Sequence, residues 1–137
     1  MKTAIELYPE YAKKEQEDGY FYGPCDYQPI IDSIGNVILQ VDDEDYQGDS
    51  RIIYKDGNRY GFLIFGWGSC SGCDALQGCD SMDEVQNLIN DLVNDVRWFE
   101  SLEDLQAYFK TKDFSLEFYY NSDATEEFIQ KTLNLRF

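Results

Sequence analysis

Three of the four cysteines lie within ten residues of one another, in a glycine-rich stretch that follows a run of apolar residues. Cys70 and Cys73 have the two-residue spacing with which one loop presents two thiolates to a metal ion, and Cys79 follows six residues later. Cys25, in a Gly-Pro loop, supplies a fourth sulfur. The sequence therefore permits one tetrahedral structural zinc site, and we expect either zinc or no cofactor.

Two other interpretations of these cysteines remain open. Cysteine is among the residue types most often buried, so all four can be reduced thiols packed in a tight turn, and Cys73→Ser would then lower stability. A Cys-x2-Cys pair after a strand is also where thioredoxin-like enzymes lower a thiol pKa. However, all three prolines precede the pair, so no later proline can face it as that fold requires. The closely spaced glycines favour a tight turn from sheet to helix.

The charge balance excludes several classes of function. The chain has 27 acidic and 11 basic side chains and no histidine, for a formal net charge of −16. Catalytic arrangements that need histidine are therefore absent, and no phosphate-binding Gly-Lys-Ser/Thr loop occurs. Direct binding to nucleic acid or to anionic membranes is disfavoured, because Lys and Arg do not cluster. We therefore expect a protein that is not an enzyme.

Two groups of acids are the candidates for partner binding. The first is a polar loop that also contains Asp49 and that we expect to project into solvent. It resembles half of a calcium-binding loop, but it lacks the glycine at position six and the terminal glutamate, so we interpret it as a solvated acidic loop. The second group lies on the outer side of a predicted helix. The two groups are Asp42, Asp43, Glu44 and Asp45 in the loop, and Asp83, Glu84, Asp91 and Asp95 on the helix.

Strands and helices must position these side chains. Runs of Ile, Val, Leu, Tyr and Phe bounded by turn residues predict strands at 36–41, 50–55 and 60–65, the last two joined by an Asp-Gly hairpin turn. Further strands are predicted at 96–99 and 114–120. Helices are predicted at 9–19, at 82–96 with a Ser81 and Glu84 capping box, and after the caps Ser101 and Asp123.

These elements predict the fold class. We expect an α+β fold with a mostly antiparallel sheet, a β-meander, and about three helices packed on one face. Residues 1–137 are expected to form a single acidic domain with one core. The aromatic stretch from Tyr20 to Tyr27 is expected to be an ordered loop. No segment is apolar enough for a membrane span or a signal peptide, so we expect a cytoplasmic protein.

The segment Ser-Cys-Ser-Gly-Cys-Asp-Ala-Leu-Gln at 69–77 carries a resemblance to known proteins. It resembles a family of small uncharacterised proteins of bacteriophages and bacteria that have the same segment after a hydrophobic strand. The similarity covers residues 48–99, including Tyr60, Gly61, Trp98 and Phe99. This resemblance implies a phage or prophage origin. Small phage proteins often bind and block a host protein, including defence nucleases, so an inhibitor is implied as a class.

Charge and resemblance together predict a protein-binding inhibitor or modulator. Its acidic surface would engage a basic host protein, such as the nucleic-acid groove of a host enzyme, because like charges on a rigid face compete with phosphate and speed association. Two alternatives stay open. The acids can serve only to keep an aromatic-rich chain in solution, or the chain can be a zinc-stabilised domain or a thiol redox protein.

Overall fold

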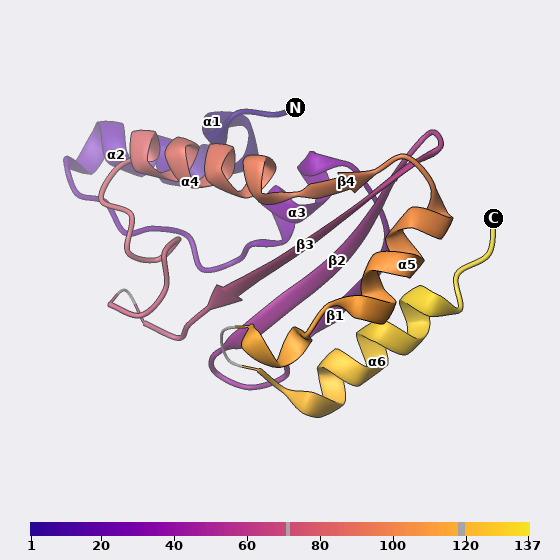
Figure 1. Cartoon of the computed structure of the whole chain (residues 1–137). Coiled ribbons are helices and arrows are strands. Elements are labelled where there is room, and N and C mark those ends of the chain that lie inside the picture. The colour runs from indigo at the N-terminus through magenta and orange to yellow at the C-terminus, as the bar shows by residue number, and fades with distance from the viewer. Residues whose placement is uncertain (71, 118–119) are drawn as a thin grey trace. The chain divides into compact units, whose positions relative to one another are not determined.

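The computed structural model describes residues 1–70, 72–117 and 120–137 (Figure 1). Its internal contacts group the chain into two units, each made of two separate stretches. We call Gly35–Trp67 with Val96–Phe137 the sheet unit, and Met1–Ile34 with Gly68–Asp95 the helical unit. That all 137 residues fold as one domain stays a prediction.

The sheet unit contains a four-stranded antiparallel sheet in the order β1-β2-β3-β4. The predicted antiparallel meander is therefore confirmed. The hairpin between the second and third strands turns through Gly57, whose φ of 59° lies in the left-handed region, and Asp56 pairs with Arg59 across it. The strands are β1 (Asn36–Asp42), β2 (Gly48–Asp56), β3 (Arg59–Trp67) and β4 (Arg97–Phe99).

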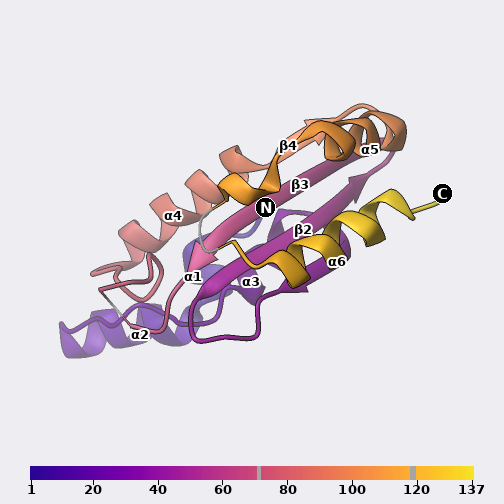
Figure 2. The ribbon, with the colours of Figure 1, turned by 60° about the horizontal axis from the view of Figure 1, so that its bottom comes forward.

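Two helices of the sheet unit, α5 (Leu102–Thr111) and α6 (Ser122–Leu133), contact each other and cover one face of this sheet (Figures 1 and 2). The predicted cap Ser101 accepts a hydrogen bond from the backbone N–H of Asp104. The last helix is capped differently from the prediction. Asn121 accepts from the first N–H groups of α6, so Asp123 lies inside the first turn instead of capping it.

The core of the sheet unit is rich in aromatic rings. Phe109 lies at its centre, with ring centroids 5.2 Å from Phe62, 5.0 Å from Phe114 and 5.4 Å from Phe128. The opposite face of the sheet is buried as well, at Ile52, Tyr54 and Leu63. The buried cluster on the helix-covered face consists of Val41, Ile53, Tyr60, Phe62, Leu105, Phe109, Phe114 and Phe128.

The strand predicted at 114–120 is wrong where the structure describes it. Residues Phe114–Leu116 form a 3-10 turn, η1, which begins where the Asp113 side chain accepts from the backbone N–H of Ser115. Phe114 is buried while Leu116 is exposed, so the expected alternation of buried and exposed side chains does not occur. Phe118 and Tyr119 lie outside the described residues.

The helical unit holds α1 (Ala4–Leu7), α2 (Pro9–Asp18), α3 (Gln28–Ile34) and α4 (Met82–Asp95). The described residues thus form six α-helices, whereas the sequence predicted four helical segments and about three helices packed on one face of the sheet. The predicted bounds of α2 are confirmed, and it ends at Gly19, whose φ is 59°. None of the helices in the described part of the chain is long and apolar enough to cross a membrane.

Helix α4 is fixed near its start by hydrogen bonds with the rest of the helical unit. The Gln86 side chain accepts from the backbone N–H of Ala4 at 2.7 Å, and the Glu15 carboxylate accepts from the backbone N–H of Met82 at 2.8 Å. Ser81 Oγ accepts from the backbone N–H of Glu84, which is one half of the predicted capping box, but the Glu84 carboxylate accepts from the backbone N–H of Asp80 instead of that of Ser81. The buried stripe of α4, at Met82, Val85, Ile89 and Leu92, therefore leaves the opposite side of a well-anchored helix exposed.

Candidate partner-binding surfaces and the cysteine loop

The outer side of α4 carries four exposed carboxylates, as predicted. Helical geometry separates Glu84 from Asp95 by about 16 Å along the axis, at about 1.5 Å per residue. Residues 68–95 contain no Lys or Arg. Among the described residues, no ion pair involves an acid of α4. The surface, which we call the α4 acidic face, consists of Asp83, Glu84, Asp91 and Asp95.

The rest of the helical unit adds to this negative charge. The unit contains 13 acidic side chains, against which stand only Lys2, Lys13 and Lys14. Lys13 forms an exposed pair with Glu17 at 4.0 Å. Because exposed pairs of this kind contribute little, the unit keeps a strongly negative field around the α4 acidic face.

The loop between β1 and β2 differs from its prediction. Asp43 and Asp49 do not project into solvent, since they are only 7% and 1% exposed. The reason is Arg51 in β2, which is 2% exposed and donates from Nη1 to Oδ1 of Asp43 at 3.0 Å. Asp43 Oδ2 also accepts from the backbone N–H of Asp49 at 2.7 Å. Of the predicted loop candidates, only Asp42, Glu44 and Asp45 are exposed.

This buried cluster holds two carboxylates and one guanidinium. Asp49 Oδ2 lies 3.9 Å from Nη2 of Arg51, and neither atom has a hydrogen-bond partner among the described residues. Burial raises the pKa of Asp49 to about 6, an effect that Arg51 opposes and that Asp43 and Glu117 increase. Arg51 thus supplies the positive charge that a metal ion would bring to a calcium-binding loop.

The exposed loop acids border a hollow in the sheet unit. A cavity of about 460 Å³ lies between this loop and the start of α6. Sequence reasoning missed the contribution of α6, although Asp123 and Glu127 have the four-residue spacing that places two acids on one side of a helix. The lining residues are Val41, Asp42, Asp43, Glu44, Asp45, Asn121, Asp123, Ala124 and Glu127.

The four cysteines have three different environments. Cys70 and Cys73 are exposed and joined by a disulfide bond, Cys25 is exposed and free, and Cys79 is buried and free. The interpretation of the cysteines as buried, reduced thiols therefore fits Cys79, is wrong about the burial of Cys25, and is wrong for Cys70 and Cys73, which are exposed and linked. The packing argument for Cys73→Ser is wrong too, because Cys73 does not pack in an apolar site.

The zinc site stays a prediction. In the arrangement described, the disulfide engages two of the four proposed sulfur ligands. Within residues 1–70, 72–117 and 120–137, no group of three or more Cys, His, Asp or Glu side chains is placed to hold a metal ion. Coordination by four sulfurs would therefore require a reduced pair and a different arrangement of this loop.

A buried aspartate organises the cysteine loop. Asp74 is 3% exposed, and its Oδ1 accepts at 3.0 Å from both the backbone N–H of Gly68 and the hydroxyl of Tyr27. Its Oδ2 accepts from the backbone N–H of Gln77 at 3.0 Å. The Tyr27 hydroxyl in turn accepts from the backbone N–H of Leu76 at 3.1 Å. Tyr27, the last residue of the aromatic segment, therefore ties this loop to the N-terminal part of the helical unit.

Burial raises the pKa values of two side chains in and beside this loop, Tyr27 and Cys79. Burial together with the charge of Asp74 raises the pKa of Tyr27, so its hydroxyl keeps its proton and donates to the carboxylate. Burial raises the pKa of the Cys79 thiol to about 11, and nearby acids add to the effect. Cys79 is therefore a protonated and unreactive thiol at neutral pH. Sequence reasoning assigned no role to Asp74.

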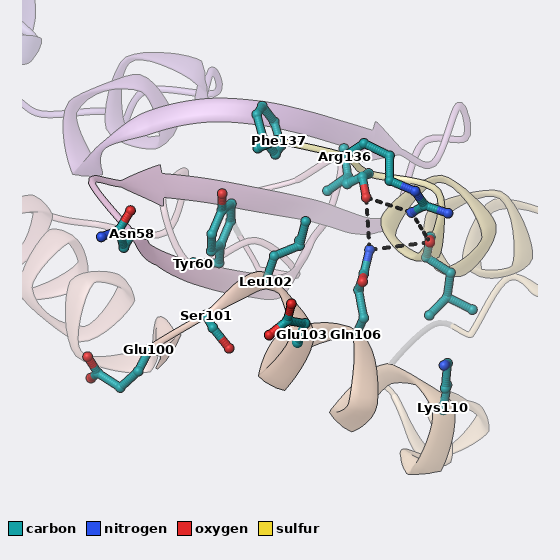
Figure 3. A pocket seen from close by; sticks show the side chains of 12 residues that line it. Asn58, Tyr60, Glu100, Ser101, Leu102, Glu103, Gln106, Lys110, Arg136 and Phe137 are labelled. Atoms are coloured by element: carbon teal, nitrogen blue, oxygen red, sulfur yellow. Dashed lines mark hydrogen bonds between the residues drawn. The ribbon is translucent and has the colours of Figure 1, made fainter.

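A second cavity, of about 740 Å³, lies in the sheet unit and was not predicted (Figure 3). The side-chain amide of Gln106 donates to the backbone oxygens of Thr132, Leu133 and Leu135, which ties the chain after α6 to α5. Arg136 donates to two of the same oxygens. Ser101 also lines this cavity, but its hydroxyl already accepts a hydrogen bond as the cap of α5. We therefore assign this cavity no chemical role.

Comparison of the chain with protein-family models, with curated protein sequences and with solved structures gave no significant match. The resemblance to phage and bacterial proteins therefore stays a prediction.

Proposed function

We propose that this chain is a non-enzymatic binding protein whose α4 acidic face engages a basic protein. The observation that carries the proposal is that Asp83, Glu84, Asp91 and Asp95 are exposed on an anchored helix and form no ion pair within the described residues. Like charges held together on a rigid element attract a partner of opposite charge and raise its association rate.

The spacing of the charges along α4 can be compared with that of the phosphates that a nucleic-acid groove binds. Helix α4 has 14 residues, and at about 1.5 Å per residue it spans about 21 Å. Its four acids therefore give about one charge per 5 Å, compared with about one per 3.4 Å for a single nucleic-acid strand and about one per 1.7 Å for duplex DNA. The face is closer to a single strand than to a duplex. We therefore propose the nucleic-acid groove of a host enzyme as the target.

The proposal also includes a biological setting. The predicted resemblance of residues 48–99 to phage and bacterial proteins implies a phage or prophage origin, and on that basis we propose that the chain is phage-encoded and acts on a host protein. A defence nuclease combines a basic groove with a role that a phage benefits from blocking. We therefore propose a defence or nucleic-acid-binding protein as the class of partner, and inhibition as the effect.

Affinity capture from a bacterial host lysate tests this proposal. The test variant replaces Asp83, Asp91 and Asp95 by Asn and Glu84 by Gln. The control variant removes the same charge from exposed sites of the sheet unit, by replacing Glu100, Glu103 and Glu126 by Gln and Asp104 by Asn.

We expect the wild type and the control variant to capture the same protein, and the test variant to lose it. We also expect the captured protein to release nucleic acid when the wild type binds. If all three chains capture the same proteins equally, the acids serve only to keep the protein from aggregating, and the proposal fails.

A further inference from the structure

We propose that Cys70 and Cys73 form a reversible dithiol–disulfide site that exchanges with low-molecular-weight thiols in the surrounding solution. Both residues are exposed, so an attacking thiolate can reach the sulfur atoms. Their Cα atoms lie 5.3 Å apart, within the range that a disulfide bond requires. The exposure of the two cysteines thus allows the disulfide bond to be opened, and the separation of their Cα atoms allows it to form again.

The loop has a second set of restraints that do not depend on the disulfide. The hydrogen bonds of Asp74 with Gly68, Tyr27 and Gln77 close the segment on both sides of the cysteine pair. The Gln77 side chain also donates to the backbone oxygen of Gly68 at 3.0 Å. Because none of these bonds involves a sulfur atom of the pair, we expect reduction to leave the helical unit folded.

The other two cysteines, Cys25 and Cys79, are free thiols that differ in their exposure to solvent. Cys79 is buried and lies in the same loop, where its Sγ is 3.3 Å from the backbone oxygen of Ala75. It is shielded from an attacking thiolate and from exchange with the pair. Cys25 is exposed and free, so it reports how an ordinary accessible thiol of this chain reacts.

The proposed reaction is a thiol–disulfide exchange with a small thiol such as glutathione. A glutathione thiolate attacks one sulfur of the pair, the bond between Cys70 and Cys73 breaks, and its electron pair stays on the other cysteine as a thiolate. A second glutathione thiolate attacks the mixed disulfide and releases oxidised glutathione. In sum, one protein disulfide and two glutathione thiols give the protein dithiol and one oxidised glutathione. The two protons that the glutathione thiols lose on ionisation are replaced, through the solvent, on the two cysteine thiolates, so no net proton is taken up.

Titration of the full chain with glutathione buffers tests this site. The protein is equilibrated at a series of ratios of reduced to oxidised glutathione, then labelled with iodoacetamide without denaturant and digested. Mass spectrometry reads the fraction of linked and labelled cysteines, and circular dichroism monitors the fold. Cys25→Ser is the matched control, and Cys70→Ser removes the pair.

We expect Cys70 and Cys73 to change together from linked to doubly labelled, with Cys79 labelled only after denaturation and with the circular dichroism unchanged. The Cys25→Ser variant should give the same titration, and Cys70→Ser should leave Cys73 unlinked. The proposal is overturned if the pair stays unlinked even in oxidised glutathione. It is equally overturned if reduction occurs only after denaturation, or if reduction unfolds the chain.

Discussion

At the scale of single residues, Arg51 holds the β1–β2 loop together. It is the cation for two buried carboxylates, at 3.0 Å from Asp43 and 3.9 Å from Asp49. We expect Arg51→Met to lower the free energy of unfolding by about 3–5 kcal/mol, because both carboxylates stay buried without a cation. Lys131→Met, which removes an exposed pair with Glu127, should cost less than about 1 kcal/mol. Urea unfolding measures both, and equal losses would contradict this account.

Asp49 makes the stability of the protein depend on pH, and the direction of the change follows from its raised pKa. Its pKa in the folded protein is about 6, above the ordinary value of about 3.9 in an unfolded chain. The folded state therefore binds the proton more tightly, so this contribution to stability is complete below about pH 4 and is lost as the pH rises through 6. Two pKa units correspond to about 2–3 kcal/mol.

The variant Asp49→Asn tests this effect, because asparagine approximates the shape of the neutral acid. In the wild type, the ionisation of Asp49 should lower the free energy of unfolding between pH 4 and 7. We expect the variant not to show this decrease when urea unfolding is measured at each pH. A profile parallel to that of the wild type would show that Asp49 does not titrate in this range.

At the scale of elements, the cysteine loop depends on a contact between residues 47 positions apart. Tyr27→Phe removes the donor to Asp74 and the acceptor for the Leu76 N–H, both of them buried. We expect a loss of about 1–3 kcal/mol and faster amide exchange over residues 72–79. Tyr20→Phe is the matched control, since the Tyr20 hydroxyl is exposed and bonds only to Tyr22 among its described hydrogen bonds. Equal amide exchange in both variants would contradict the assigned role.

The same scale shows which features the sequence could predict. The strands and α2, α4 and α5 were predictable because apolar periodicity and end signals act locally. The helices α1 and α3 were missed because four and seven residues form too few turns for a periodic pattern. The burial of Asp43 was missed because it depends on Arg51, eight positions further along. The role of Asp74 depends on Tyr27, so local composition did not indicate it.

At the scale of the whole molecule, the charge of −16 is shared unequally, with most of the excess in the helical unit. In the sheet unit, Arg51 and the Lys112–Glu117 pair at 2.7 Å offset part of the negative charge. The α4 acidic face has no such compensation among the described residues. We therefore assign partner binding to α4 in preference to the β1–β2 loop, where Asp43 is already engaged.

The salt dependence of binding tests this assignment most directly. The captured partner would be titrated with the wild type, the α4 test variant and the sheet-unit control at 50 and at 300 mM salt. We expect the added salt to weaken wild-type and control binding about tenfold or more, because it screens exposed charges over about 6–14 Å. The α4 variant should bind weakly at both concentrations. Wild-type affinity that ignores salt, or an α4 variant that binds as tightly as the wild type, would contradict the central claim.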